Sequence, residues 1–198
     1  PITYILKLKK DSKISKIVNN KKNILAVRFP KHKITRMLLK SLEYPLAAPS
    51  ANISTKVSSV CSNDVRDDFG KKIKYILDGG KSLIGLESTI ISLVDKPRIL
   101  RLGGLMVSKI NKCLKKNLRY RSKNLKISSP GQMKIHYSPG IPIKLNVKKP
   151  NQNDAHLLIK KPKNPKFNFY YLSQSGDLNE AAKNLYSTLR RIKKDKFK

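Results

Sequence analysis

The 198-residue chain lacks the features that define membrane, disulfide-stabilised and zinc-binding proteins. Its apolar runs, such as residues 24–27 and 90–94, are far shorter than the roughly 18 residues that span a bilayer. The start of the chain has no basic stretch before an apolar segment, so we expect no secretory signal peptide. Cys61 and Cys113 form no CxxC motif, and the three histidines form no HExxH motif. The composition therefore predicts a soluble, reduced, cytoplasmic protein.

Acidic residues are also scarce. Twelve Asp and Glu stand against 44 Lys and Arg, which gives a formal net charge of +32. One explanation is an electrostatic footprint for nucleic acid. The other is the codon bias of an AT-rich genome, because lysine far outnumbers arginine and Asn and Ile are abundant. The lysines are spread over the whole chain, which favours codon bias, although the excess also attracts an anionic substrate.

Hydrophobic periodicity predicts an α/β protein. Strands are expected at residues 2–9, 24–29, 46–48, 73–77, 89–94 and 98–102, and helices at 33–42, 63–69 and 107–114. A basic segment that contains Pro and Gly follows, which is typical of a linker. A second unit is then predicted, with strands at residues 143–147, 156–159 and 167–172 and a helix at 177–192 that Asp177 caps.

Polar and small residues follow several of these strands. Arg28 and Arg101 each end a strand, Ser50 and Asn52 follow another, and an Asp-Gly-Gly turn at residues 78–80 follows a fourth. Ligands of open α/β sheets bind at the carboxyl ends of strands, and Arg presents a planar fork to phosphate or carboxylate. Each element alone is more often a tight turn or a solvated charge. Their clustering predicts a ligand site.

Four motifs in order then resemble the YrdC-type threonylcarbamoyl-AMP synthases. They are PLAAPSANIS at residues 45–54, ILDGG at 76–80, GLESTII at 85–91 and ILRLG at 99–103. The segment AVRFP at 26–30 and the initial PIT fit the same family, and SPGQMKIHYSP at 129–139 resembles the linker of its two-domain branch. The resemblance implies a YrdC-like twisted mixed sheet with helices over residues 1–114, a linker over 115–142, and part of a small α/β C-terminal domain over 143–198.

The activity implied by the resemblance is that of an L-threonylcarbamoyladenylate synthase. Such an enzyme joins L-threonine, bicarbonate and ATP, with Mg2+, into threonylcarbamoyl-AMP and pyrophosphate for the N6-threonylcarbamoyladenosine modification of tRNA. The implied partners are these substrates, the downstream threonylcarbamoyl transferase machinery and tRNA, but no membrane. The step requires positioning and charge stabilisation rather than a side-chain nucleophile, so no catalytic residue and no protein-bound metal is predicted.

The resemblance also assigns roles to individual positions. The threonine-binding positions of the family match Arg28, Ala48 and Ser88. Its ATP-binding positions match Ser50, Ser58, Arg101 and Tyr137, the last being the tyrosine that folds over the nucleotide. Asn52 is expected to support the loop that carries Ser50 and Ser58.

Departures from the family pattern matter too. Thr55 stands where the family loop has Gly, Leu102 where Pro is common, and Ile24 where Thr often precedes the arginine strand. The Lys, Arg and Thr that the family places nearer its N-terminus have no counterparts that can be assigned here. We therefore expect the chain to be an incomplete copy of a synthase, truncated at both ends and unable to make threonylcarbamoyl-AMP alone.

Three other functions stay open. The first is an RNA-binding YrdC-like module without catalysis, against which the aromatic content of 7% argues. The second is a carbamoyltransferase of the hydrogenase-maturation type, against which the linker motif argues. The third is a non-catalytic partner of the ribosome or of tRNA.

Overall fold

The computed structural model describes residues 2–19, 22–118, 120, 137–149 and 151–197. Contacts divide the chain into two compact units, Pro1–Pro49 with Glu87–Gln132 and Ser50–Leu86 with Met133–Lys198. The expected domain boundaries at residues 114 and 142 follow family motifs along the chain and stay predictions. Most of the predicted linker, including its motif up to residue 136, lies outside the described residues.

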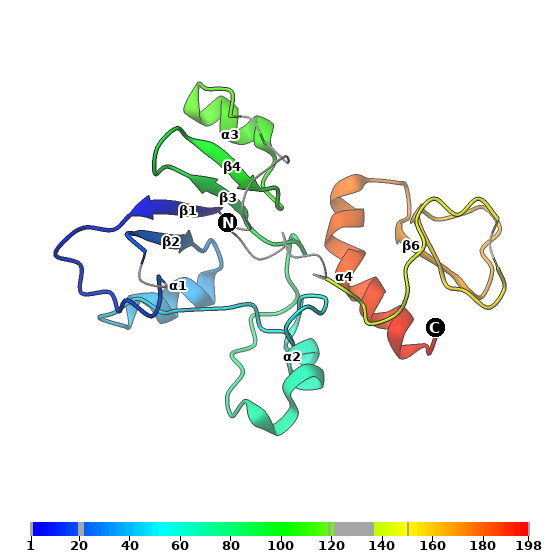
Figure 1. Cartoon of the computed structure of the whole chain (residues 1–198). Helices are drawn as coiled ribbons and strands as arrows, with labels where there is room; N and C mark the ends of the chain where they lie inside the picture. Colours follow the sequence, from blue (N-terminus) through cyan, green and yellow to red (C-terminus); the bar gives the residue numbers. More distant parts are fainter. Residues whose placement is uncertain (1, 20–21, 119, 121–136, 150, 198) are drawn as a thin grey trace. The chain divides into compact units, whose positions relative to one another are not determined.

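The first unit is built on a mixed four-stranded sheet (Figure 1). Its strands are β1 (Ile2–Lys7), β2 (Ile24–Phe29), β3 (Thr89–Ser92) and β4 (Arg98–Arg101), in the order β2-β1-β3-β4. The β1–β3 pair is parallel, and the other two pairs are antiparallel. Two helices belong to this unit, α1 (Lys33–Lys40) and α3 (Val107–Leu114). The predicted α/β fold with a mixed sheet is confirmed.

The core of this unit lies between the sheet and α3. Ile91 of β3 and Ile99 of β4 are cross-strand partners, each 1% exposed, and Ile110 of α3 packs against them. All four residues of β3 are buried. Ile90 and Ile91 supply the apolar centre of this strand, and the buried Thr89 hydroxyl is satisfied by donating to the Leu105 carbonyl at 2.8 Å. The core therefore fixes the two strands that lead into the site described below.

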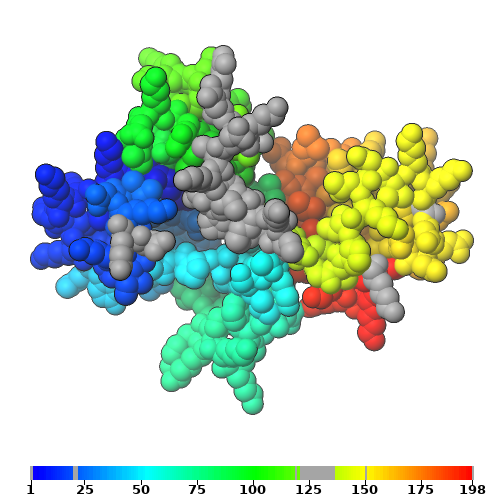
Figure 2. All heavy atoms as spheres, in the orientation of Figure 1, coloured from blue at the N-terminus to red at the C-terminus, as the bar shows by residue number. Residues whose placement is uncertain are grey.

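The second unit combines two helices with a parallel pair of strands. These elements are α2 (Ser62–Phe69), a 3-10 turn η1 (Gly70–Lys72), β5 (His156–Lys160), β6 (Phe169–Ser173) and α4 (Leu178–Lys194). The residues of β5, β6 and the segment between them form one contiguous surface in the space-filling view (Figure 2). The Asp177 carboxylate accepts a hydrogen bond from the Glu180 N–H at 2.7 Å, so the predicted cap of α4 is confirmed.

Three predicted strands are wrong. Residues 46–48, 73–77 and 143–147, all of them described, form no strand. Each segment has an apolar side chain that faces solvent, with Leu46, Leu77 and Leu145 exposed by 45, 63 and 82%. A short apolar run forms a strand only where a neighbouring strand pairs with it, and the sequence does not show that partner. None of the described helices is long and apolar enough to cross a membrane.

Candidate functional site

A chain of hydrogen bonds crosses the sheet of the first unit and links all of its strands. Nε of Arg28 on β2 donates to Thr3 Oγ1 on β1 at 3.1 Å. The hydroxyls of Thr3 and Ser88 share a buried hydrogen bond of 2.7 Å, with Ser88 directly before β3. Nη2 of Arg101 at the end of β4 donates to Ser88 Oγ at 3.2 Å. Two guanidinium groups therefore converge on one pair of hydroxyls.

The strand register explains this arrangement. Thr3 pairs with Arg28 across β1 and β2, and Ile90 pairs with both Thr3 and Arg101. Residues directly opposite on neighbouring strands project from the same face of a sheet. Ser88 comes two residues before Ile90 and so belongs to the same face. The pairing of strands thus gathers residues that are up to 98 positions apart in the sequence.

Electrostatics favour an anion at this point of the sheet. Thr3 and Ser88 are 4 and 7% exposed, whereas Arg28 lies at the exposed side. Loss of solvent around its guanidinium, and then repulsion by Arg101, lower the pKa of Arg28 below its ordinary value, while the Glu87 carboxylate opposes the shift. A negative group bound beside both guanidinium groups would relieve their repulsion and accept charge-assisted hydrogen bonds.

The two hydroxyls add a donor to the site. Thr3 Oγ1 accepts from Arg28 and Ser88 Oγ accepts from Arg101, and one of the two hydroxyls donates to the other. A hydroxyl carries one hydrogen and two lone pairs. This chain of bonds therefore consumes one of the two hydroxyl hydrogens and leaves the other to be donated to a ligand.

Hydrogen bonds from Arg101 at the end of β4, and from the segment after it, hold the turn that precedes β3. Nε and Nη2 of Arg101 donate to the Ser88 carbonyl at 3.1 and 3.0 Å, and the Gly104 N–H donates to the Glu87 carbonyl at 2.9 Å. A Cβ on Gly103 would lie 2.3 Å from that Glu87 oxygen and 2.5 Å from the backbone nitrogen of Thr89. Glycine is required at position 103 because the two backbone segments approach too closely for any side chain.

The second unit carries the loop that contains two of the predicted ATP-binding serines. Asn52, 8% exposed, donates from Nδ2 to the carbonyls of Ile53 at 2.8 Å and Lys56 at 3.1 Å, which closes the turn of the loop. Ser59 Oγ donates to the Ala51 carbonyl at 2.6 Å. Residues 50–59, which we call the serine loop, are therefore closed by side chains of the loop itself.

Tyr137 belongs to a segment that pairs with the serine loop. The Ser138 N–H donates to the Thr55 carbonyl at 2.9 Å, and the Val57 N–H donates to the Ser138 carbonyl at 3.2 Å. The Tyr137 ring stacks on that of Tyr186 from α4, with 5.7 Å between centroids. The linker tyrosine thus packs on the C-terminal helix beside this loop.

The predicted site residues are divided between the two units. Arg28, Ser88 and Arg101 are brought together in the first unit. Ala48 is exposed in an irregular segment of the same unit. The remaining four belong to the second unit, where Ser50 is exposed and Ser58 is half-buried: they are Ser50, Asn52, Ser58 and Tyr137.

Thr3 lies at the centre of this site, but it is not among the site residues predicted from the sequence. Thr3 joins Arg28 to Ser88, and the signal for it was the resemblance of the initial PIT to the family's threonine-ended segment. Within the described part of the chain, no group of three or more His, Cys, Asp or Glu side chains could hold a metal ion.

The fold and the site define an α/β protein with two guanidinium groups arranged for an anionic ligand. A family model described as "Telomere recombination" (Sua5_yciO_yrdC) matches residues 1–103, and one described as "Threonylcarbamoyl-AMP synthase, C-terminal domain" matches residues 105–198. The chain belongs to this Sua5/YciO/YrdC family, in its two-domain branch.

Curated relatives and a solved structure agree with this assignment. The chain is 37% identical over 145 residues to the threonylcarbamoyl-AMP synthase of Pyrococcus abyssi, covering 70% of this chain and 42% of that protein. It is 33% identical over 180 residues to that of Schizosaccharomyces pombe, covering 86% and 42%. The crystal structure of P. abyssi Sua5 complexed with L-threonine aligns with a TM-score of 0.81 and 28% identity, over 98% of this chain and 62% of that one. The chain spans 42% of the length of each of these two curated relatives.

Proposed function

We propose that this chain is part of an L-threonylcarbamoyladenylate synthase. The observation that carries the proposal is the convergence of Arg28 and Arg101 on the Thr3–Ser88 hydroxyl pair. The relatives that match the chain are named threonylcarbamoyl-AMP synthases, and the P. abyssi neighbour was solved with L-threonine. A carboxylate and a phosphate are both anions that such a pair of guanidinium groups recognises.

The reaction converts threonine, bicarbonate and ATP into threonylcarbamoyl-AMP, pyrophosphate and water. The threonine amine and bicarbonate first give a carbamate with loss of water. A carbamate oxygen then bonds to the α-phosphorus of ATP, and the bond from that phosphorus to the bridging oxygen breaks, releasing pyrophosphate. The protein supplies position and fixed positive charge, which stabilise the negative charge that develops at phosphorus.

In this proposal the two arginines divide the substrates between them. Arg28 binds the threonine carboxylate, with Ser88 and Ala48 at the same end of the site. Arg101 faces the nucleotide, together with Ser50, Ser58 and Tyr137, while Asn52 supports the serine loop. In this proposal Mg2+ enters with the triphosphate as a substrate ion. The proposed product serves tRNA modification through a downstream transferase.

The test is turnover by the full protein with ATP, L-threonine, bicarbonate and Mg2+, followed by detection of threonylcarbamoyl-AMP and pyrophosphate. Product that depends on threonine and bicarbonate supports the proposal. Arg28→Lys keeps the charge but loses the planar fork, so it separates geometry from charge. Tight, steeply salt-dependent RNA binding without release of pyrophosphate would instead support the RNA-binding module.

A further inference from the structure

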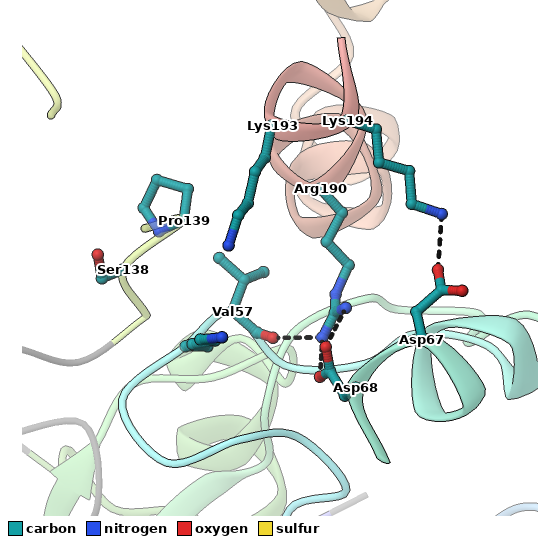
Figure 3. Close-up of a pocket in the computed structure, with 9 residues that line it drawn as sticks. Val57, Asp67, Asp68, Ser138, Pro139, Arg190, Lys193 and Lys194 are labelled. Carbon is teal, nitrogen blue, oxygen red and sulfur yellow. Dashed lines mark hydrogen bonds and ion pairs between the residues drawn. The ribbon is translucent and has the colours of Figure 1, made fainter. Parts of the chain in front are cut away.

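Arg190 of α4 lies where three segments of the second unit meet (Figure 3). Its guanidinium donates to both carboxylate oxygens of Asp68 on α2, at 3.1 and 2.7 Å. Nη2 also donates to the Val57 carbonyl at 2.7 Å. It donates to Ser59 Oγ at 3.3 Å as well. The side chain is 14% exposed and that of Asp68 is 12% exposed. One arginine of the C-terminal helix therefore binds two positions of the serine loop directly.

The ionised form of Asp68 is favoured at this point. Arg190 and the backbone of Ile53 both lower the pKa of its carboxyl. Burial alone would raise the pKa of Asp68, but the hydrogen bonds and charge of Arg190 outweigh burial and keep that pKa below its ordinary value. The Arg190–Asp68 pair thus contacts the serine loop in the part that follows Thr55, at Val57 and Ser59.

Arg190 Nε also lies 3.8 Å from an Asp64 carboxylate oxygen on α2, whereas the ion pair of Lys194 with the same helix is exposed. Lys194 Nζ lies 2.6 Å from an Asp67 carboxylate oxygen, but these side chains are 66 and 46% exposed. An exposed pair contributes little because water and salt screen it. A mostly buried pair leaves an uncompensated charge when one partner is removed. The attachment of α4 to the serine loop therefore depends on Arg190 rather than on Lys194.

The loop also meets the segment 138–139, and a hollow of about 250 Å³ lies between them and the ion pair. Arg190, Ser138 and Pro139 line it together with Val57. The serine loop is thus in contact with α4 and with the segment that carries Tyr137. The contact of α4 with the loop backbone is made by the Arg190 guanidinium, which donates to the Val57 carbonyl.

We infer that Arg190 is a positioning residue that sets the conformation of the serine loop and so the affinity for ATP. The inference rests on the proposed function, because it assigns the serines of this loop to the nucleotide. It gives α4, which lies in the part of the chain matched by the C-terminal family model, a role at the nucleotide end of the site. Because Arg190 acts through the loop backbone, its loss should affect the nucleotide and not the threonine.

The experiment compares Arg190→Gln with Arg191→Gln in the full protein. Arg191 neighbours it on the same helix, is 74% exposed and pairs with Asp195 four residues on, so it is a matched control. We expect Arg190→Gln to raise the KM for ATP by about tenfold or more, the cost of a lost charge-assisted contact, with the KM for threonine within about twofold of wild type. Hydrogen exchange without substrates should become at least about tenfold faster at the amides of residues 53–57. Arg191→Gln should change none of these quantities.

Each outcome separates the inference from the proposed function. If the wild type forms no threonylcarbamoyl-AMP, the proposed function falls and the inference that Arg190 sets ATP affinity falls with it, whatever the exchange shows. If the wild type is active and Arg190→Gln changes neither the KM for ATP nor the exchange, the inference is overturned. An equal rise in both KM values overturns it as well, because that result shows a general loss of structure. If Arg190→Gln does not fold, Arg190→Lys and Asp68→Asn decide the same question, since the first keeps the charge without the fork and the second keeps the shape without the charge.

Discussion

Replacement of Thr55 by glycine should stabilise the protein. Thr55 has a φ of +70°, in the left-handed region that favours glycine, and it stands where the family loop has glycine. Its side chain is exposed, so little packing is lost when it is removed. Its carbonyl accepts from the Ser138 N–H at 2.9 Å, and that bond does not depend on the side chain. The substitution therefore removes strain and keeps the backbone contacts of the loop.

The expected gain is the difference between two effects. A left-handed conformation costs an L-residue about 1–2 kcal/mol, and a β-branched side chain lies toward the upper end. Glycine in turn loses more chain entropy on folding, about 0.5–1 kcal/mol. The net stabilisation is about 0.5–1.5 kcal/mol. For a chain of this length this corresponds to a rise in Tm of about 1–6 °C.

The assay is thermal and urea unfolding of Thr55→Gly beside Thr55→Ala. Alanine keeps a Cβ at the same positive φ, so it should gain clearly less than glycine. An unchanged or lower Tm for Thr55→Gly would refute the reasoning. An equal gain for both variants would show that the side chain, and not the backbone conformation, was unfavourable.

Three further predictions concern Arg28 and Gly103 in the first unit and Tyr170 on β6 of the second unit. Arg28→Ala should raise the KM for threonine by about 10- to 150-fold, the loss of a charge-assisted contact of about 1.5–3 kcal/mol, and an unchanged KM would remove Arg28 from the site. Gly103→Ala should lower the free energy of unfolding by about 1–3 kcal/mol and displace Ser88, since its Cβ meets backbone; unfolding at wild-type urea concentrations would contradict this. Burial, and then the hydrogen bond to Asp195, raise the pKa of Tyr170 to about 12. The stability from this shift is present below the unfolded tyrosine pKa of about 10 and is lost as pH rises toward 12, so Tyr170→Phe should flatten the alkaline part of the stability curve. A phenolate titration by absorbance with every tyrosine ionising near pH 10 would contradict the last prediction.

The ends of locally encoded elements could be predicted well from sequence. The strand at residues 24–29 and the helix at 107–114 have the predicted bounds, and Asp177 caps α4 as expected. Each of these depends on side chains within a few residues of one another, such as an apolar stripe or a cap three residues from its partner. The order of motifs likewise sufficed to identify the family, because it depends on residue types along the chain and not on contacts.

The partners of each strand and loop were decided only by the tertiary structure. Residues 46–48 have the same apolar character as a buried strand, but they stay irregular, and no strand in the described part of the chain pairs with them. Thr3 lies in the candidate site because the register of β1 against β2 pairs it with Arg28. A shift of the register by one residue would place Thr3 on the other face of the sheet. Arg190 gave no signal at all among the 44 basic residues of the sequence. Its role depends on the fold, which places its guanidinium 2.7 Å from the carboxylate of Asp68, 122 positions away in the sequence. Because both side chains are mostly buried, the two residues form a specific ion pair.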